Sequence, residues 1–225
     1  LNHAVNMYGL KDNVARKAGT MGKEENKEME FWTQEEFQAF LECVADKPIS
    51  YYAFEILYWT GIREGELLAL TPGDFNFEKK TLRINKSYQR LEGKDVITDP
   101  KTPKSNRTIV MPDFLTIEME DFIKSIYGIK MDDRIFTISK SYLHHEMDRG
   151  AKLAGVKRIR IHGLRHSHIS LLINLGFSAL AIGERVGHEA VDITYRYAHL
   201  FPTVQTDMAA QLETEREALV DVRKE

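Results

Sequence analysis

The spacing of hydrophobic residues predicts a chain made mostly of helices. The first clear helix covers 33–45, where Thr33 and Glu36 form a capping-box pattern ahead of apolar residues spaced three and four positions apart. A second, more apolar helix is predicted over 50–59, and Gly61 ends it. The same spacing predicts further helices over 64–70, 113–127, 141–154, 162–175, 178–186, 194–197 and 206–220.

Strands are predicted in one region, where the hydrophobic period shortens to two. The segments 81–84 and 109–111 alternate in this way, and 96–98 is the predicted third strand. The connection 99–107 is polar and basic and contains two prolines, which indicates an exposed turn. The expected fold class is therefore α+β, mainly helical, with a small three-stranded antiparallel sheet.

Composition divides the chain into three parts. Residues 1–18 have the apolar pattern of a helix that ends before Gly9, and we interpret them as the end of a separate domain. Residues 19–30 are polar and charged, which is typical of a linker. The remainder, 31–225, is long enough for one large domain with a helical tail at its C-terminal end.

Bulk composition argues against several classes of protein. No apolar run approaches the roughly 18 to 20 residues that span a bilayer, so no membrane partner is expected. The single cysteine, Cys43, excludes an internal disulfide and fits a reducing cytoplasm. Because Cys43 lies within the apolar pattern of the first predicted helix, a buried structural thiol is favoured over a reactive one.

Charge is unevenly distributed along the chain. The formal net charge of -3 and the pI near 6.3 argue mildly against a nucleic-acid partner. However, 79–107 contains nine Lys or Arg against three acids, and 149–183 contains six basic residues and no acid. A phosphate backbone responds to a local basic face rather than to the net charge. The two segments therefore indicate nucleic acid, although solvated charged faces would give the same counts.

Several residues have side chains suited to phosphoryl transfer. Arg63 follows the helix end at Gly61, while His162 and Arg165 are three positions apart on a predicted helix and share a face. A guanidinium can bind two phosphate oxygens at once. His188 follows a glycine at a helix end, from where an imidazole can donate to a phosphate. Each residue alone is more often an ordinary surface or core residue, so the combination carries the hypothesis.

Neighbouring residues have supporting or structural interpretations. Glu66 lies one turn after the first arginine and can hold its guanidinium, or form a simple ion pair. His166 stays open between a phosphate contact and a supporting role, whereas His168 belongs to an apolar stripe and is expected to be a buried structural histidine. Tyr195 and Tyr197 point to nearly opposite sides of a helix, so only one of them can face a site.

The order and spacing of these residues resemble the tyrosine recombinases, the phage-integrase family. That family has the order Arg, Lys, His-x-x-Arg, His, Tyr, and the chain matches it over about 30–205 with Arg63, Lys101, His162, Arg165, His188 and Tyr197. The family's tyrosine typically lies nine positions after the second histidine and precedes x-His, and Tyr197 meets both conditions. The resemblance implies the catalytic fold of the DNA breaking-rejoining enzymes, and it selects Tyr197 over Tyr195.

The resemblance also implies what these residues do. Tyr197 would attack the scissile phosphate and form a 3′-phosphotyrosine, releasing a 5′-hydroxyl. Arg63, Arg165 and His188 would stabilise the charge of the transition state. The chain would then be a site-specific recombinase or integrase of a phage or mobile element.

Proton transfer would fall to two further residues. His162 would exchange a proton with the tyrosine or orient it. Lys101 would protonate the leaving oxygen, with Lys104 as the alternative because the family's turn varies in length. Since the phosphotyrosine bond conserves energy, the resemblance implies no ATP, no metal and no other cofactor.

The implied partner is double-stranded DNA that carries attachment sites. The family exchanges strands as a homo-tetramer on DNA, with accessory DNA-bending or directionality factors as further partners. Residues 1–18 resemble the end of the family's core-binding domain. The isolated chain could be monomeric, and its tail over 206–220 could pack in cis or on a neighbouring protomer.

Three other functions compete with this one. His162 and His166 have the i,i+4 spacing of a metal site, but no glutamate lies between them as in His-Glu-x-x-His, and Arg165 would repel a cation. A catalytically silent DNA-binding module would keep the fold and the basic face. A type IB topoisomerase would use the same chemistry without site preference.

Overall fold

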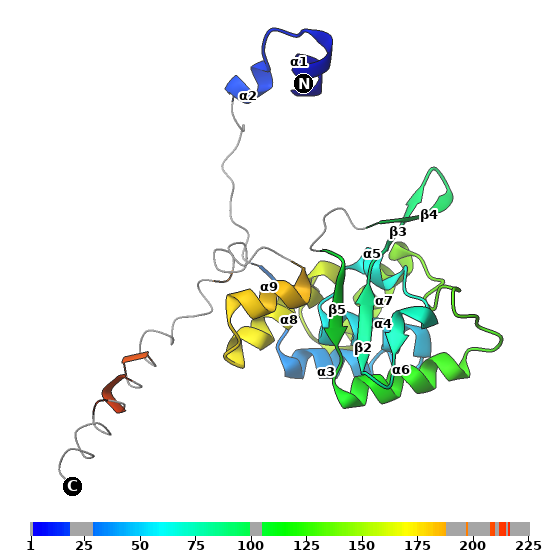
Figure 1. Ribbon diagram of the computed structural model, residues 1–225. Coiled ribbons are helices and arrows are strands. Elements are labelled where there is room, and N and C mark those ends of the chain that lie inside the picture. Colours follow the sequence, from blue (N-terminus) through cyan, green and yellow to red (C-terminus); the bar gives the residue numbers. More distant parts are fainter. Residues whose placement is uncertain are drawn as a thin grey trace.

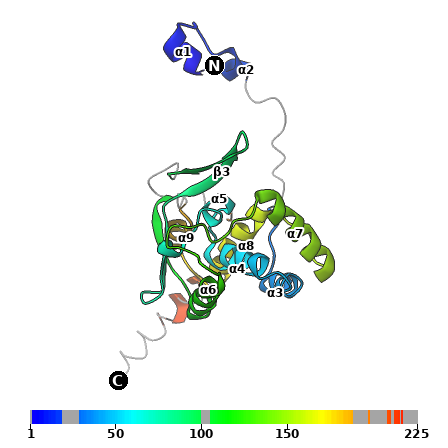
Figure 2. The same ribbon diagram turned by 90° about the vertical axis from the view of Figure 1, so that its right-hand side faces the viewer.

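The computed structural model describes residues 2–18, 29–99, 105–187, 197, 208–209, 212–214 and 216. Most of these residues form a body of packed helices with a small sheet on one side (Figures 1 and 2). The helices of the body are α3 (Gln34–Glu42), α4 (Pro48–Thr60), α5 (Glu64–Leu67), the 3-10 helix η1 (Pro72–Asp74), α6 (Asp113–Ser125), α7 (Lys140–Ala154), α8 (Ile161–Asn174) and α9 (Ala179–Val186).

Two short helices at the N-terminal end, α1 (Asn2–Tyr8) and α2 (Val14–Ala18), contribute nothing to the core of the body. No residue of α1 is buried, and the described side chains of α2 are exposed. α1 ends before Gly9, which has a φ of 68°, so this helix end is confirmed. The assignment of residues 1–18 to a separate domain stays a prediction.

Local sequence signals begin and end the helices as expected. The side chain of Thr33 accepts a bond from the backbone of Glu36, and the Glu36 carboxylate accepts one from the backbone of Thr33, so the capping box at α3 is confirmed. Gly61 ends α4 and Gly187 ends α9, both in the left-handed conformation. These two helix ends turn out to support the candidate site.

The predicted three-stranded antiparallel sheet is present, but one of its strands was wrongly assigned. Residues 96–98 do form a strand, yet they pair in a separate two-stranded ribbon closed by a turn at Glu92 and Gly93. Both turn residues have positive φ, which allows the two adjacent strands to pair as a tight hairpin. An alternating sequence pattern predicts a strand but not the strand with which it pairs. The sheet has the order β1 (Phe75–Asn76), β2 (Thr81–Ile84), β5 (Arg107–Val110), and the ribbon pairs β3 (Ser87–Leu91) with β4 (Lys94–Thr98).

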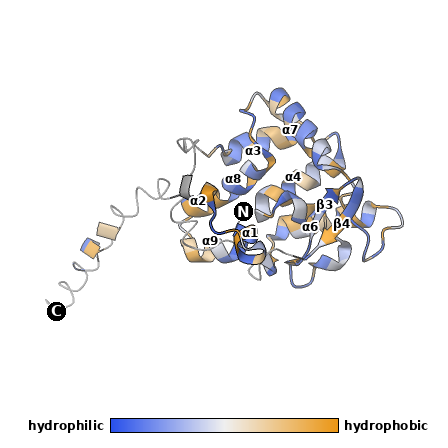
Figure 3. Cartoon of the chain, turned by 90° about the horizontal axis from the view of Figure 1, so that it is seen from above, coloured by the Kyte–Doolittle hydropathy of each residue, from blue (hydrophilic) through white to orange (hydrophobic). Residues whose placement is uncertain are grey.

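An extensive apolar core holds the helices together. Aromatic rings are prominent in it: the centroid of Phe40 lies 4.7 Å from that of Trp32 and 4.8 Å from that of Phe54. α7 packs closely on α3, because a Cβ at Gly150 would come within 2.4 Å of the Phe40 ring. Figure 3 shows hydrophobic colouring over much of α9. A second, smaller cluster joins this helix to α8 and consists of Ile169, Ile173, Ile182, Val186 and Tyr197.

The two helices predicted nearest the C-terminal end fall mostly outside the described residues. Tyr197 is helical, as are the described residues within 206–220. Across the part of the chain that the structure describes, no helix combines the length and apolar character needed to cross a membrane.

Candidate active site

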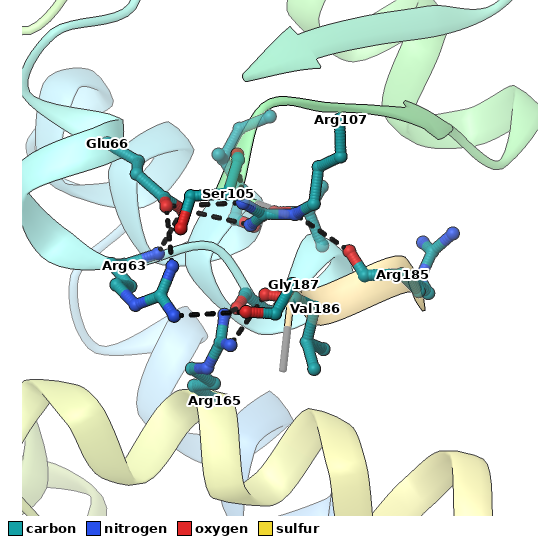
Figure 4. A network of polar contacts seen from close by, with 11 residues as sticks. Arg63, Glu66, Ser105, Arg107, Arg165, Arg185, Val186 and Gly187 are labelled. Carbon is teal, nitrogen blue, oxygen red and sulfur yellow. Dashed lines mark hydrogen bonds and ion pairs between the residues drawn. The ribbon is translucent and has the colours of Figure 1, made fainter. Parts of the chain in front are cut away.

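The C-terminal end of α9 presents three consecutive backbone carbonyls to three arginines. The carbonyl of Arg185 accepts a hydrogen bond from Arg107 at 2.9 Å. The carbonyl of Val186 accepts one from Arg165 at 2.6 Å, and that of Gly187 accepts one from Arg63 at 3.3 Å (Figure 4). The arginines come from β5, from α8 and from the corner that begins α5. Because the last carbonyls of a helix carry partial negative charge, this helix end gathers three cations at one place.

Arg165 is the most enclosed of the three arginines, with 1% of its surface exposed. It also donates to the carbonyl of Gly61 at 2.6 Å, so it joins the ends of α4 and α9. Gly61 has a φ of 64°, and a Cβ there would lie 2.6 Å from the ring of His168, so the corner requires glycine. Burial, and then the charges of the two neighbouring arginines, lower the pKa of Arg165. A bound anion would oppose both effects, so this position favours a negative ligand.

Arg63 is the more accessible arginine, with 35% of its side chain exposed. Its Nη1 donates to Glu66 Oε1 at 2.9 Å, and its backbone N–H donates to Glu66 Oε2 at 2.9 Å. The corner approaches β3 closely, since a Cβ at Gly65 would lie 2.6 Å from the Oγ of Ser87. The supporting role predicted for Glu66 towards Arg63 therefore has direct contacts behind it.

Arg107 is the part of the network that the sequence reasoning missed. Its Nη1 and Nη2 donate to the Glu66 carboxylate at 3.2 and 2.9 Å, and both side chains are 6% exposed. Burial alone would raise the pKa of Glu66, but the bonds and charges of Arg107 and Arg63 bring it below its ordinary value. The prediction of an exposed turn over 99–107 is wrong at its end, since Arg107 is buried in β5 on the same face as Ile109. The available signal was its place two positions before an inward residue of the predicted strand.

A cleft of about 680 Å³ opens beside this network. It lies between the α5 corner, the β3–β4 ribbon and the beginnings of α7 and α8. Within the described residues, its lining carries four basic side chains, Arg63, Lys86, Lys140 and Arg160, and three acidic ones, Glu64, Glu66 and Asp99. Lys86 already pairs with Asp74 at 2.6 Å. The side chains around it include Arg63, Glu66, Lys86, Ser105, Lys140, Arg160 and His162.

Tyr197 lies in the smaller apolar cluster, and none of its surface is exposed. Its hydroxyl forms a hydrogen bond with Nδ1 of His166. The His166 ring in turn meets the ring of His162 edge-on, with 4.8 Å between centroids. His166, which the sequence left open between two roles, is thus the histidine that contacts the tyrosine hydroxyl here.

The structure brings together only part of the predicted site. Arg63 and Arg165 meet at the end of α9, and His162 lines the same cleft as Arg63. His168 is buried and its Nε2 accepts a bond from Arg185 at 3.0 Å, so its predicted structural role is confirmed. Burial and the neighbouring positive charges lower the pKa of His168 to about 3. Four predicted or alternative residues lie outside the described residues: Lys101, Lys104, His188 and Tyr195.

No group of three or more His, Cys, Asp or Glu side chains within the described ranges is placed so that it could hold a metal ion. The i,i+4 pair His162 and His166 is therefore not joined by a third such ligand there.

Comparisons with known proteins identify the family of the chain. The model of the phage integrase family matches residues 30–203. The chain belongs to this family. It is 32% identical over 217 residues to the ICEBs1 integrase of Bacillus subtilis (strain 168), a match that covers 90% of this chain and 58% of that protein. The integrase of Staphylococcus phage L54a is 30% identical over 179 residues, covering 72% of this chain and 51% of the phage protein.

Solved structures of the family share the fold. A Tn1549 transposon integrase in complex with a circular intermediate DNA superposes with a TM-score of 0.71 at 22% identity, covering 84% of this chain and 68% of that one. The catalytic domain of bacteriophage HP1 integrase gives a TM-score of 0.57 at 20% identity, covering 81% and 95%. The expected tyrosine-recombinase catalytic fold is thus confirmed. The chain spans 58% and 51% of the two curated relatives named above.

Proposed function

We propose that this chain is the catalytic part of a site-specific recombinase that cuts and rejoins DNA through a 3′-phosphotyrosine, without metal or ATP. The observation that carries the proposal is the convergence of Arg63 and Arg165 on adjacent carbonyls at the end of α9, beside a cleft that Lys140 and Arg160 also line. Two guanidiniums held side by side suit the oxygens of one phosphate, because each presents a planar fork of donors. Family membership makes DNA recombination the relevant reaction.

The reaction divides into bond formation and bond cleavage at one phosphorus atom. The phenol oxygen of Tyr197 forms the bond to phosphorus, and the bond from phosphorus to the 5′ oxygen breaks. That oxygen takes a proton, which we assign to Lys101, and leaves as a 5′-hydroxyl. Arg63, Arg165 and His188 stabilise the added negative charge, which is usually the largest catalytic contribution. Attack by the 5′-hydroxyl of another strand reverses these steps and releases the tyrosine.

The tyrosine hydroxyl must become accessible before it can react, and Tyr197 already lies close enough to Arg165 to influence the pKa of that arginine. Tyr197 is enclosed by apolar side chains, and its hydroxyl is bonded to His166 rather than directed into the cleft. Binding of DNA would therefore have to uncover this hydroxyl. His166 and His162 are the imidazoles placed to accept or return the phenol proton, since their rings adjoin each other.

We place this reaction on double-stranded DNA in the cytoplasm, with four copies of the chain assembled on the attachment sites. The DNA complexes of the Tn1549 integrase support a duplex substrate. Exposed apolar side chains at the junction of α8 and α9 offer a surface for a neighbouring protomer, and the tail also exposes apolar residues. These side chains are Leu175, Phe177, Leu180, Met208 and Leu212.

Covalent trapping tests the proposal directly. The full-length protein is incubated with a pool of nicked duplexes of randomised sequence, and DNA that stays attached in SDS is recovered, sequenced and mapped on the protein by mass spectrometry. A nick near the cleaved phosphate lets the short strand diffuse away, which leaves the adduct trapped. We expect the adduct on Tyr197, its loss in Tyr197→Phe with DNA binding retained, and substantial adduct in Tyr195→Phe.

Two other outcomes would contradict the proposal. An adduct on Tyr195 would reject Tyr197 as the nucleophile. Binding without any adduct would indicate the catalytically silent DNA-binding module. The role of Lys101 is tested separately with a 5′-bridging phosphorothiolate, whose sulfur leaves without protonation. This substrate should restore cleavage to Lys101→Ala but not to Arg165→Ala.

A further inference from the structure

We infer that Arg107 is a positioning residue that holds Arg63 in place for the phosphate. The inference rests on the proposed function, because that function assigns Arg63 to the phosphate. Arg107 occupies none of the motif positions, and only 6% of its side chain is exposed. Its Nε, Nη1 and Nη2 donate to the carbonyl of Arg185, the carbonyl of Ser105 and the carboxylate of Glu66, so we infer that its effect passes through these groups.

Glu66 connects the two arginines. Its Oε1 accepts from Nη1 of Arg63 at 2.9 Å and from Nη1 of Arg107 at 3.2 Å. Its Oε2 accepts from the backbone N–H of Arg63 at 2.9 Å and from Nη2 of Arg107 at 2.9 Å. The two-pronged bond from Arg107 fixes the plane of the carboxylate. The plane of the carboxylate then decides where the guanidinium of Arg63 lies.

Removing Arg107 would leave a buried carboxylate with one partner that faces solvent. Glu66 is 5% exposed, whereas the side chain of Arg63 is 35% exposed. A buried charge that has lost a partner is strongly disfavoured and moves towards whatever compensation remains. Among the influences that lower the pKa of Glu66, the hydrogen bonds from Arg107 are the largest. Glu66 would thus turn with the flexible Arg63 side chain instead of fixing it.

Arg107 also fixes the opposite side of the site. Its Nε donates to the carbonyl of Arg185 at 2.9 Å, two positions before Gly187, whose carbonyl accepts from Arg63. Its Nη1 donates to the carbonyl of Ser105 at 3.1 Å. One side chain therefore spans α5, the beginning of β5 and the end of α9 (Figure 4). It sets the distance between the two groups that hold Arg63.

Substitution of Arg107 by lysine distinguishes an effect of its hydrogen-bond geometry from an effect of its positive charge. Arg107→Lys keeps the positive charge but cannot make the two-pronged bond and the Nε bond together. If Arg107 acts by position, the lysine variant should be impaired almost as much as Arg107→Met. If it acts by its charge alone, the lysine variant should cleave at the parent rate, and that result would overturn the inference.

The closing experiment compares these variants with a matched control. Arg149→Met is the control, because Arg149 also binds a buried glutamate and a backbone carbonyl, but its glutamate, Glu146, does not line the cleft as Glu66 does. Single-turnover cleavage is measured on a nicked duplex that the parent protein cleaves, together with DNA affinity and Tm. We expect Arg107→Met to cleave about 10- to 100-fold more slowly at nearly unchanged DNA affinity. Arg149→Met should lower the Tm and leave the cleavage rate unchanged.

The effect of Arg107 should also depend on Arg63. In an Arg63→Lys protein, Arg107→Met should slow cleavage by less than about threefold, because the residue through which it acts is already altered. An equal factor in both backgrounds would indicate a purely structural role and would overturn the inference. If Arg107→Met does not fold, Arg107→Lys takes its place in the same cycle. Absence of any adduct with the parent protein would instead reject the proposed function.

Discussion

Two buried glutamates in this protein have similar partners but different surroundings. Glu66 accepts bonds from Arg63 and Arg107, and Glu146 accepts bonds from Lys47 and Arg149. Both glutamates are 5% exposed, and in both the cationic partners bring the pKa below its ordinary value despite burial.

The two networks differ in what their cations face. Around Glu146 the arginine returns to the carbonyl of Cys43 and to Asp46, so it ties α7 to the end of α3. Around Glu66 the arginines reach the end of α9, and Arg63 lines the cleft. The same ion-pair chemistry thus joins helices in one place and holds an arginine at the edge of a cleft in the other. A buried ion pair is weak grounds for stability by itself, so the surroundings must be tested.

The largest expected difference concerns the arginines themselves. Arg165→Ala should raise the barrier of the cleavage step by about 2–4 kcal/mol, by analogy with the loss of one oxyanion donor. Arg149→Ala should leave that barrier unchanged and lower the Tm, because its contacts join helices. Single-turnover rates and thermal unfolding of the two variants check this contrast. If a folded Arg165→Ala protein cleaves at the parent rate, Arg165 does not take part in cleavage.

A smaller difference is expected between the glutamates. Glu66→Gln keeps the shape of the side chain but removes the charge that holds two guanidiniums. The activation free energy of cleavage should therefore rise by about 1.5–3 kcal/mol. Glu146→Gln should reduce the free energy of unfolding by a similar amount without slowing cleavage. Rates on a nicked duplex and urea unfolding measure the two effects. If both variants lose stability and neither loses rate, the comparison between the networks fails.

A third buried glutamate, Glu55, sharpens the comparison because its neighbour is another carboxylate. Burial, and then the charge of Glu118, raise the pKa of Glu55 to about 8. The native state therefore binds a proton that the unfolded state has released, so stability falls as the pH rises from about 4.5 to about 8. The slope is at most about 1.4 kcal/mol per pH unit.

Glu55→Gln should flatten this pH dependence. The amide cannot ionise, so the variant should gain stability relative to the parent at pH 8 and differ little near pH 5. Urea unfolding between pH 5 and pH 8 gives the measurement. Glu146→Gln is the control, and its free energy of unfolding should still decline over this range. A parent protein whose stability does not decline between these pH values would contradict the raised pKa.

The sequence determined the elements and the family. Thr33 and Glu36 encode a helix start, and Gly61 and Gly187 encode helix ends, because each signal acts within a few residues. The spacing from Arg63 to Tyr197 was enough to indicate the phage integrase family, which the family match confirms. The roles of the individual site residues stay predictions. The wrong strand in the sheet arose where this local information ends, since alternation fixes a strand and not its partner.

Only the tertiary structure decided how the arginines are held. Arg63 meets a carbonyl 124 positions away, Arg165 one that is 104 positions away, and Arg107 a carboxylate 41 positions away. No periodicity or cap records such contacts, because they exist only after the helices have packed. Burial of Tyr197 against α8 and α9 has the same origin. A sequence pattern therefore specifies which groups are available, whereas packing sets the distances and the electric field in which they act.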